Sequence, residues 1–524
     1  MSADRRGDRP TDGGRGGRPA DDRRGGRPTD GRRGGRRGGP PQRSRTAPAQ
    51  RGRQGDPSRL AAYTVLRAVA DGAYANLELP QEIRRRRLSG RDAGFATELT
   101  YGTLRMQGLY DEIIAVAADR PVRRLDPSAL DVLRLGAHQL FGMRVPEHAA
   151  ADQSVALARQ VAGAGAAGLV NAVMRRMSER TLEQWREEVV PDQPAAARLA
   201  VSTSHPEWVV KALRQALVGH GAATKETIDE RLGELLTAHN VPAPVTLVAR
   251  PGLSTAEELL GAVGLTTSAG EHSPFAVVIA GGDPGSLAAV REGRAAVQDE
   301  GSQLLPLALA QVPVEGVDGA ERWLDLCAGP GGKAGLLASL AAERGAALVA
   351  NEVSEHRAEL VRQTLRPALA AAREAGRELE VRVGDGREVG AEEPARYHRV
   401  LVDAPCTGLG ALRRRPEARW RRSPDDLTTL GPLQRDLLTS GLDALAPGGV
   451  LAYATCSPHL SETRFVVEDV LRRRGDAELL DAPETLQQVC VGDLEGTGDG
   501  PMAQLWPHLH GTDGMFLALI RKTR

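Results

Sequence analysis

Apolar positions recur at three- and four-residue spacing between residues 58 and 180. Leu60, Tyr63 and Leu66 mark one such stripe, and Leu130, Leu133 and Leu140 mark part of another. This spacing places the apolar side chains on one face of a helix, and β-branched runs are few. The pattern predicts an all-α domain over residues 59–190, with a boundary at the Pro-containing segment 191–194.

The pattern changes after residue 195. Residues 195–240 keep a helical period, whereas segments 245–249 and 276–280 are short apolar runs typical of strands. Segment 254–263 between them has a helical pattern. Residues 195–298 are therefore expected to form helices followed by a small α+β module.

Strands and helices alternate from about residue 321, within a predicted third domain of residues 299–524. The candidate strands are residues 323–326, 347–352, 380–383, 399–403, 450–455 and 515–520. Spaced leucines from 427 to 445 predict a helix that segment 423–426 (SPDD) caps. The alternation indicates a doubly wound α/β sheet. Ligands of such sheets bind beyond the carboxyl ends of the strands, so candidate chemistry is sought there.

Charge divides the chain unevenly. Residues 1–58 contain 16 Arg, no Lys and 7 Asp, a net charge of +9, so residues 59–524 carry −9. The same segment has 14 Gly and no Val, Ile, Leu, Phe, Trp or Tyr. It cannot bury enough apolar surface to fold and is predicted to be a disordered tail. Contact with RNA phosphates and a passive tail both remain open for it.

Other features exclude whole classes of protein. No run approaches 18 consecutive apolar residues, and the first residues lack an apolar signal core, so neither a membrane helix nor secretion is expected. Four cysteines in 524 residues do not form a disulfide scaffold and fit a reducing compartment such as the cytoplasm. There is no CxxC pair and no cluster of histidines, so no metal site is predicted.

A glycine-rich loop, DLCAGPGGK (325–333), follows the first strand of the predicted sheet. Its glycines and the following helix N-terminus suit a ligand that approaches the backbone. It is not a Walker A loop, because Cys327 and Ala334 stand where that motif needs Gly and Ser or Thr. Glu352 ends the next strand about 20 residues later, where an acidic residue holds a ribose diol. The pair predicts a cofactor that contains adenosine.

Two of the four cysteines lie just beyond adjacent candidate strands, in DAPC (403–406) and TCS (455–457). A thiolate that adds to carbon 6 of a pyrimidine makes carbon 5 able to attack an electrophilic methyl group. One cysteine can supply that nucleophile, the other can help remove the carbon-5 proton, and Asp403 can stabilise charge near ring nitrogen 3. The base must first leave its stack. Cys490 has no partner motif and is expected to be a structural thiol.

Three further groups have two interpretations each. Asp385 either accepts a hydrogen bond from an adenine amino group or begins a turn. The strip RRRPEARWRR (413–422) has six Arg and Trp420 next to the candidate site, which favours RNA contacts over a solvated helix start. The run of four arginines at 84–87 is either a solvated helix face or part of an RNA-facing surface.

The motif series resembles the NOL/NOP/Sun family of RNA cytosine-5 methyltransferases. LDLCAGPGGK (324–333), VGDGR (383–387), VLVDAPCTGLGALRRRPEARW (400–420) and YATCSP (453–458) match its motifs in order and spacing. The resemblance implies a Rossmann-like class I methyltransferase sheet that uses S-adenosylmethionine. It assigns the nucleophile to Cys456 and assistance in product release to Cys406. It places cofactor contacts at Cys327, Ala328, Gly329, Pro330, Gly331, Gly332, Lys333, Glu352, Asp385 and Asp403.

Two departures from that family's pattern leave every required group in place. The loop reads CAGPGGKA where CAAPGGKT is frequent, and Glu352 stands where Asp is frequent. The longer Glu side chain shifts the expected ribose contact slightly.

The N-terminal helical region resembles the NusB RNA-binding fold. The segments that carry this likeness are ELTYGTLR (98–105), LDPSALDVLRLGAHQLF (125–141), HAAADQSVALAR (148–159) and GLVNAVMRR (168–176). A NusB-like domain ahead of this methyltransferase indicates the RsmB/Fmu (Sun) branch, which modifies 16S ribosomal RNA, free or in an early small-subunit particle. No DNA partner is expected, and the sequence gives no oligomeric state. An RNA-binding factor with an idle catalytic domain, and an enzyme acting on tRNA or another RNA, remain as alternatives.

Overall fold

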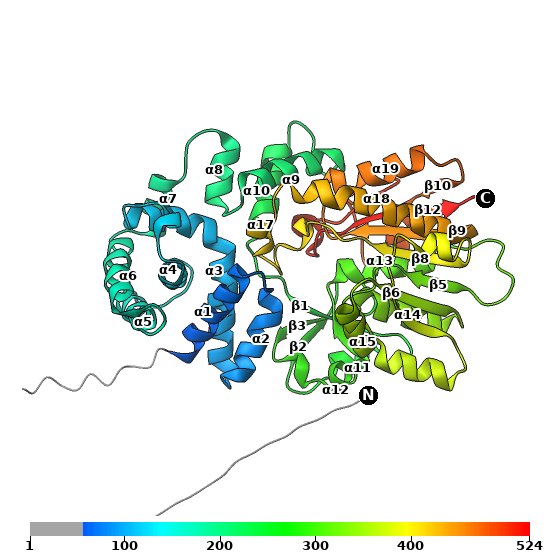
Figure 1. Ribbon diagram of the computed structural model, residues 1–524, viewed down its shortest axis with the longest axis horizontal. Coiled ribbons are helices and arrows are strands. Elements are labelled where there is room, and N and C mark those ends of the chain that lie inside the picture. Colours follow the sequence, from blue (N-terminus) through cyan, green and yellow to red (C-terminus); the bar gives the residue numbers. More distant parts are fainter. Residues whose placement is uncertain (1–55) are drawn as a thin grey trace, which may run out of the picture. The chain divides into compact units, whose positions relative to one another are not determined.

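The computed structural model describes residues 56–524 (Figure 1). The predicted disordered tail therefore lies outside the described residues, except at its end. Helix α1 (Pro57–Ala70) begins at Pro57, and the Asp56 side chain caps it by accepting the Arg59 N–H at 2.9 Å. The boundary predicted at residue 58 is thus two residues too late, because an Asp-Pro pair starts the helix.

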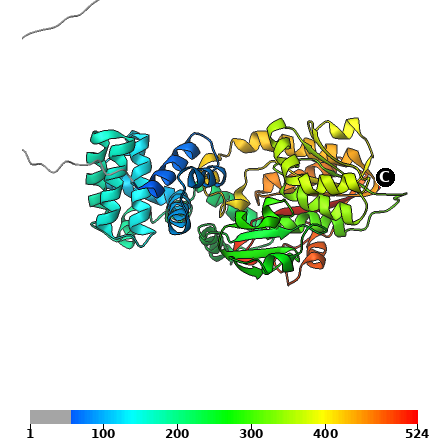
Figure 2. The ribbon, with the colours of Figure 1, turned by 90° about the horizontal axis from the view of Figure 1, so that it is seen from below.

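The helices of the N-terminal region lie together (Figures 1 and 2), and their buried side chains form one apolar core. After α1 its helices are α2 (Ala75–Arg85), α3 (Gly90–Ala117), η1 (Val122–Arg124), α4 (Pro127–Phe141), α5 (Glu147–Val161), α6 (Gly163–Met177) and α7 (Leu182–Val189). Leu99 and Ile113 of α3, Leu133 of α4, Val170 of α6 and Trp185 of α7 are fully or almost fully buried in it. The predicted all-α fold is confirmed.

A second helical cluster follows, formed by α8 (Ala195–Ser202), α9 (Glu207–Gly219) and α10 (Ile228–Ala238). Its core includes Leu213, Leu232 and Leu236. Leu409, Leu412 and Trp506 from the C-terminal region belong to the same core. These helices therefore pack directly on the part of the chain that carries the candidate site.

A four-stranded antiparallel sheet, in the order β2-β3-β1-β4, comes next. Its elements are β1 (Val245–Ala249), α11 (Ala256–Leu260), β2 (Thr266–Ala269), β3 (Ala276–Gly281), η2 (Pro284–Ser286), α12 (Ala288–Arg291) and β4 (Ala295–Val297). The two predicted strands are present. The predicted helix is shorter than 254–263, and the sequence analysis did not identify β2 and β4.

The C-terminal region holds an eight-stranded sheet in the order β10-β12-β9-β8-β5-β6-β7, with β11 paired to β12. Its strands are β5 (Arg322–Asp325), β6 (Ala347–Glu352), β7 (Leu379–Val383), β8 (Tyr397–Asp403), β9 (Leu445–Thr455), β10 (Ala477–Leu480), β11 (Ala503–Gln504) and β12 (Phe516–Lys522). Strands β5 to β9 are parallel, and β12 is antiparallel to β9. The predicted α/β sheet is confirmed.

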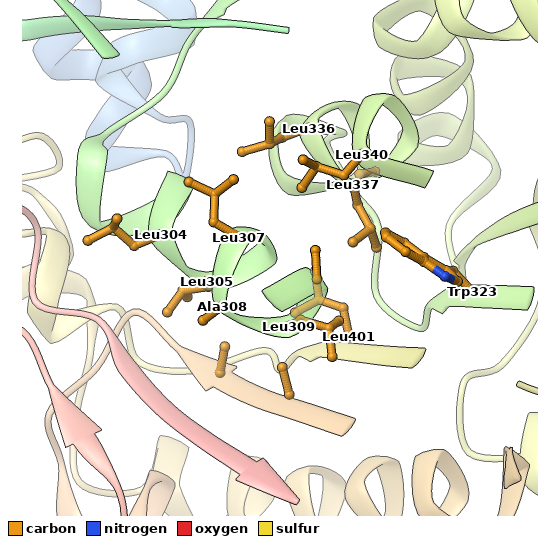
Figure 3. Close-up of a cluster of buried hydrophobic side chains, with 14 of the residues drawn as sticks. Leu304, Leu305, Leu307, Ala308, Leu309, Trp323, Leu336, Leu337, Leu340 and Leu401 are labelled. Carbon is orange, nitrogen blue, oxygen red and sulfur yellow. The ribbon is translucent and has the colours of Figure 1, made fainter. Parts of the chain in front are cut away.

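Helices cover both faces of this sheet. One face carries α13 (Glu300–Gln311), α14 (Gly332–Glu343), α15 (Glu355–Glu374) and α20 (Ala482–Val489); the other carries α16 (Val389–Glu392), α18 (Asp426–Ala444) and α19 (Arg464–Arg472). Figure 3 shows leucines of α13 and α14 beside Trp323 and Leu401 of the sheet. The remaining short helices are η3 (Leu409–Ala411), α17 (Ala418–Arg421), η4 (Leu460–Glu462) and α21 (Pro507–His510).

The start of α18 differs in detail from the prediction. Asp425 occupies the N-cap position but makes no side-chain cap hydrogen bond. Instead the Asp426 carboxylate accepts the Ser423 N–H at 2.8 Å and pairs with Arg422 at 2.9 Å.

Residues 56–524 contain neither a membrane-spanning helix nor a cluster of metal-binding side chains. None of their helices combines the length and the apolar character needed to cross a bilayer. Nor do their His, Cys, Asp and Glu side chains gather in any group of three or more that could hold a metal ion.

Candidate active site

Two cysteines lie at the carboxyl ends of neighbouring parallel strands. Cys456 directly follows β9, and Cys406 lies three residues beyond β8. The register of this pair sets Asp403 opposite Ala454, so both strands end at one edge. The two Sγ atoms are 3.4 Å apart, within hydrogen-bond distance for sulfur. Both thiols are free and half-buried, so the structure brings together two groups that are 50 residues apart in the sequence.

The two thiols hold their protons unequally. The contact between the two Sγ atoms, in which either atom can be the donor, lowers the pKa of the Cys456 thiol below its ordinary value even though burial opposes this. The same contact, together with burial, raises the pKa of Cys406 well above its ordinary value. The nearby cations Arg415 and Lys333 lower the pKa of Cys456 further. These opposite shifts favour a thiolate at Cys456 over one at Cys406.

An ion pair lies beside the thiols. Lys333, in the first turn of α14, places its Nζ 2.8 Å from Oδ2 of Asp403 at the end of β8. Burial disfavours the ammonium, but the Asp403 carboxylate outweighs burial and raises the pKa of Lys333. The Asp403 side chain keeps 27% of its surface exposed. Lys333 is thus a fixed cation near Cys456, while Asp403 keeps a side open to a ligand.

A buried carboxylate that the sequence analysis did not single out joins the two cysteine loops. Glu462 has no exposed surface. It accepts hydrogen bonds from the Thr407 N–H at 2.7 Å, the Thr407 hydroxyl at 2.5 Å and the Ser457 hydroxyl at 2.6 Å. Thr407 directly follows Cys406, and Ser457 directly follows Cys456. Glu462 therefore fixes the loops that set the distance between the two sulfur atoms.

The same network extends into α18 and β9. Gln434 of α18 donates to Glu462 at 3.3 Å and to the Pro405 carbonyl at 2.8 Å. The Tyr453 hydroxyl donates to the Glu462 carbonyl at 2.9 Å. Both sides of the thiol pair are thus held by buried hydrogen bonds. The sequence contains one indication of this network: a residue with a hydroxyl group directly follows each of the two cysteines.

The glycine-rich loop between β5 and α14 depends on two close approaches. The Gly329 N–H donates to Glu352 Oε2 at 3.1 Å, and a Cβ at Gly329 would come within 2.4 Å of that oxygen. Gly331 has a φ of 111°, and α14 begins at Gly332. A side chain at Gly329 would collide, and one at Gly331 would be strained, so the loop needs both glycines.

Protein groups already engage both carboxylate oxygens of Glu352, which is 2% exposed. Oε1 accepts the Ser354 N–H at 3.0 Å, and Oε2 accepts the Gly329 N–H and lies 3.3 Å from Arg357. The structure therefore shows Glu352 holding the loop. Its contact with a ribose remains a prediction.

Asp325, by contrast, has an oxygen without a partner. It ends β5, is fully buried, and its Oδ1 accepts the Cys327 N–H at 3.4 Å, while Oδ2 has no hydrogen-bond partner among the described residues. Burial and the nearby Asp403 carboxylate raise the pKa of Asp325 to about 8. Burial also raises the pKa of the Cys327 thiol, which keeps that thiol neutral. An unpartnered carboxylate oxygen in this loop suits a ligand that brings its own cation.

The ends of β6 and β7 offer apolar surface next to the loop. Val353 is 64% exposed and Val383 is 39% exposed. Asp385, beyond β7, accepts the Arg387 N–H at 3.0 Å and its guanidinium at 2.5 Å, which lowers the pKa of Asp385. Asp385 thus begins a turn, as one of its two interpretations predicts.

The structure corrects the interpretation of the strip 413–422. Arg414 is half-buried and pairs with Asp299 at 2.6 Å and Asp513 at 3.1 Å. Trp420 donates its Nε1–H to the Leu104 carbonyl at 3.3 Å, so its ring is occupied by α3. Arg414 and Trp420 therefore hold separate regions of the chain together. They are not available for the RNA contacts that the sequence analysis predicted.

Arg419 gives the strongest correction in this strip. It is fully buried and donates to the Ser204 carbonyl at 3.0 Å, the His239 carbonyl at 3.2 Å and Asn240 Oδ1 at 2.8 Å. Of the six arginines in the strip, Arg415 alone is exposed. The planar guanidinium donates in several directions, which suits it to linking backbone carbonyls from several elements.

Comparisons with known proteins agree with this architecture. Residues 315–521 match the family described as 16S rRNA methyltransferase RsmB/F, and residues 56–179 match the NusB family. A Mycobacterium tuberculosis protein whose name assigns it to the methyltransferases is 48% identical over 89% of this chain and 97% of its own length. The ribosomal RNA small subunit methyltransferase B of Pseudomonas syringae pv. tomato is 32% identical over 88% of this chain and 96% of its own.

A solved structure shows the same fold. The crystal structure of PH0851 aligns with a TM-score of 0.72 at 21% identity, over 89% of this chain and 99% of that one. At this level of identity the likeness concerns the fold alone.

Proposed function

This chain belongs to the RsmB/F family of 16S rRNA methyltransferases, and from that premise we propose that it methylates carbon 5 of a cytosine in 16S rRNA. The observation that carries the proposal is the pair of thiols 3.4 Å apart, one with a lowered pKa and the other with a raised pKa. Transfer to a ring carbon of a pyrimidine needs a nucleophile at carbon 6 and a base near carbon 5. The Cys456 thiolate supplies the nucleophile, and Cys406 supplies the base once it has given up its own proton.

The residues of the loop fit S-adenosylmethionine, which supplies an electrophilic methyl group when bound. The unpartnered Oδ2 of Asp325 suits the ammonium of its amino-acid part. The exposed side chains of Val353 and Val383 suit an adenine face, and Glu352 lies next to them at the end of β6. The rest of the contact set comprises Cys327, Ala328, Gly329, Pro330, Gly331, Gly332, Lys333, Asp385 and Asp403.

In the proposed reaction the Cys456 thiolate forms a bond to carbon 6 of the flipped cytosine. The Asp403 carboxylate accepts a hydrogen bond from the proton on ring nitrogen 3. Lys333, whose Nζ lies 2.8 Å from Asp403 Oδ2, offsets the negative charge of that carboxylate. Carbon 5 then takes up the methyl group. Cys406 gives its own proton to ring nitrogen 3 as the bond to carbon 6 forms, and the thiolate left behind removes the carbon-5 proton, because a thiolate of higher pKa is the stronger base. Loss of the carbon-5 proton breaks the carbon–sulfur bond and releases Cys456. The proton on ring nitrogen 3 leaves to solvent as the product forms.

We further propose that the substrate is 16S rRNA, either free or in an early small-subunit particle. The NusB-like helices support an RNA substrate by analogy only, because a fold does not fix a function.

Bisulfite sequencing of rRNA from a deletion strain tests the proposal. We expect cytosine-5 methylation to disappear at one or more positions of 16S rRNA and to return with the wild-type gene. The Cys456→Ala gene should fail to restore it, whereas the matched Cys490→Ala gene should restore it. An unchanged methylation pattern in 16S rRNA would contradict the proposal and favour an RNA-binding factor. Loss of methylation confined to tRNA would show that tRNA is the substrate.

A further inference from the structure

The exposed face of α2 carries a stripe of side chains typical of nucleic-acid contacts. Tyr74, Leu77, Gln81 and Arg84 follow one another at three- and four-residue spacing, which places them on one side of the helix. All four are exposed, Tyr74 by 40% and Leu77 by 57%. The stripe thus combines an aromatic ring, an aliphatic chain, an amide and a guanidinium, and the half-buried Glu78 in the first turn of α2 borders it.

The start of α2 is fixed to the loop that follows Cys406. Tyr74 at the N-cap makes no side-chain cap bond, and the Ala75 N–H instead donates to Glu417 at 3.3 Å. Arg421 donates to the carbonyls of Ala73 and Val69. Segment 412–422 therefore holds the stripe in a defined place relative to the thiols.

Arg415 links this stripe to the site. Its guanidinium lies 5.9 Å from the centre of the Tyr74 ring, and that of Arg421 lies 4.7 Å from it. Arg415 forms no ion pair with any described residue, unlike Arg414 in the same loop. It also lies close enough to Cys456 to act on that thiol electrostatically. An exposed, unpaired cation in the loop that follows Cys406 thus lies against the Tyr74 ring.

We propose that Tyr74, Arg415 and the exposed stripe of α2 bind the single-stranded RNA next to the target base; this rests on the proposed function. Bases stack on aromatic rings and guanidinium planes, and arginines contact the phosphates between them. A single strand fits better than a duplex, because the target must leave its stack to reach the thiols. The surface therefore selects substrates in which the nucleotides beside the target are unpaired.

Steady-state methylation of a protein-free 16S rRNA transcript by the full chain tests this surface. Tyr74→Ala and Arg415→Ala should each raise the KM for RNA about tenfold, the loss expected for one stacked base. The KM for S-adenosylmethionine should stay unchanged, and Tyr74→Phe should stay within about twofold of wild type. Arg415→Ala should also lower the slope of log affinity against log salt by about one.

Arg159→Ala, an exposed arginine of α5 in the same helical region, is the matched control. Wild-type KM values for RNA in both Tyr74→Ala and Arg415→Ala would overturn the surface, and so would an equal loss in Arg159→Ala. Failure of the wild-type chain to methylate the transcript would instead overturn the proposed function. In that case filter binding of the same transcript by Tyr74→Ala and wild type still decides whether the surface contacts RNA.

Discussion

At the scale of single residues, the proposed roles of the two cysteines depend on the hydrogen bond between their thiols. The Sγ atoms of Cys406 and Cys456 lie 3.4 Å apart, and a Cys406 S–H that donates to a Cys456 thiolate lowers the pKa of Cys456. Removing that donor should raise the pKa of Cys456, because its thiolate loses a hydrogen bond. Cys406→Ala should therefore slow alkylation of Cys456 by iodoacetamide at neutral pH and move the pH midpoint upward.

Peptide mass spectrometry across a pH series measures this midpoint directly. Cys490→Ala is the control, because Cys490 lies apart from the pair and burial raises the pKa of its thiol to about 11. An unchanged midpoint for Cys456 in Cys406→Ala would show that the two thiols are not coupled.

Asp325 predicts how cofactor affinity depends on pH. Its pKa of about 8 means that it is mainly protonated at neutral pH, and a bound ammonium favours the carboxylate. Binding then requires loss of that proton, so affinity should rise with pH, by up to about tenfold per unit below 8. Calorimetry of S-adenosylmethionine binding between about pH 5.5 and 7 avoids titration of the ligand's own amine. The Asp325→Asn variant should bind S-adenosylmethionine weakly, with an affinity that does not change with pH. If its affinity kept the wild-type dependence on pH, Asp325 would not be the group that binds the ammonium.

At the scale of elements, the short segments after β8 and β9 are held by a single carboxylate. Glu462→Ala would leave the Thr407 and Ser457 hydroxyls without their acceptor and free the two cysteine loops. Since small displacements of reacting groups cost up to about 100-fold in rate, we expect kcat to fall by about that factor. The KM for S-adenosylmethionine should change little.

Glu462→Gln, which keeps the shape and part of the hydrogen bonding, should recover much of the rate. Glu468→Ala, a partly exposed glutamate on α19, serves as the control and should behave as wild type. If Glu462→Ala retained the wild-type kcat, the network would have no part in positioning the thiols.

The elements around the site were predictable because burial fixes them. Strands β5, β6 and β8 contain short buried apolar runs, and the structure places each within two residues of its predicted start. Strand β7 is only partly buried, and it begins one residue before its predicted start. Parallel strands end at one edge of a sheet, so the meeting of Cys406 with Cys456 followed from strand order alone. The edge strands β10 and β2 were missed because they are only partly buried and lack a clear apolar pattern.

Side-chain partners were not predictable in the same way. The strip 413–422 suggested RNA contacts by its charge, yet Arg419 binds carbonyls 179 to 314 residues away in the sequence. Glu462 has partners in two separate loops. Neither the composition nor the spacing of residues predicts such side-chain pairs, because these pairs form only when distant elements pack together.

At the scale of the whole described chain, Arg419 joins the helical regions to the catalytic sheet. It is buried without a carboxylate partner, and burial lowers its pKa to about 9. Arg419→Met should leave several buried carbonyls unsatisfied and reduce the free energy of unfolding by about 3 kcal/mol. Thermal unfolding measures this as a midpoint several degrees lower, with faster proteolysis between α7 and α8.

Arg415→Met is the matched control for that experiment, because Arg415 is the exposed arginine of the same loop. It should change the free energy of unfolding by less than about 0.5 kcal/mol. Equal midpoints for Arg419→Met and Arg415→Met would show that the buried arginine does not hold the regions together.

In the proposed reaction Cys456 forms the covalent bond to the RNA base, and Cys406 assists the step that breaks this bond. The most direct measurement is a denaturing gel of the full chain incubated with 16S rRNA and S-adenosylmethionine. Cys406→Ala should accumulate a slow, nuclease-sensitive protein–RNA band, whereas Cys456→Ala and the double variant should form none. A band that appears with Cys456→Ala and is absent from Cys406→Ala would contradict the account.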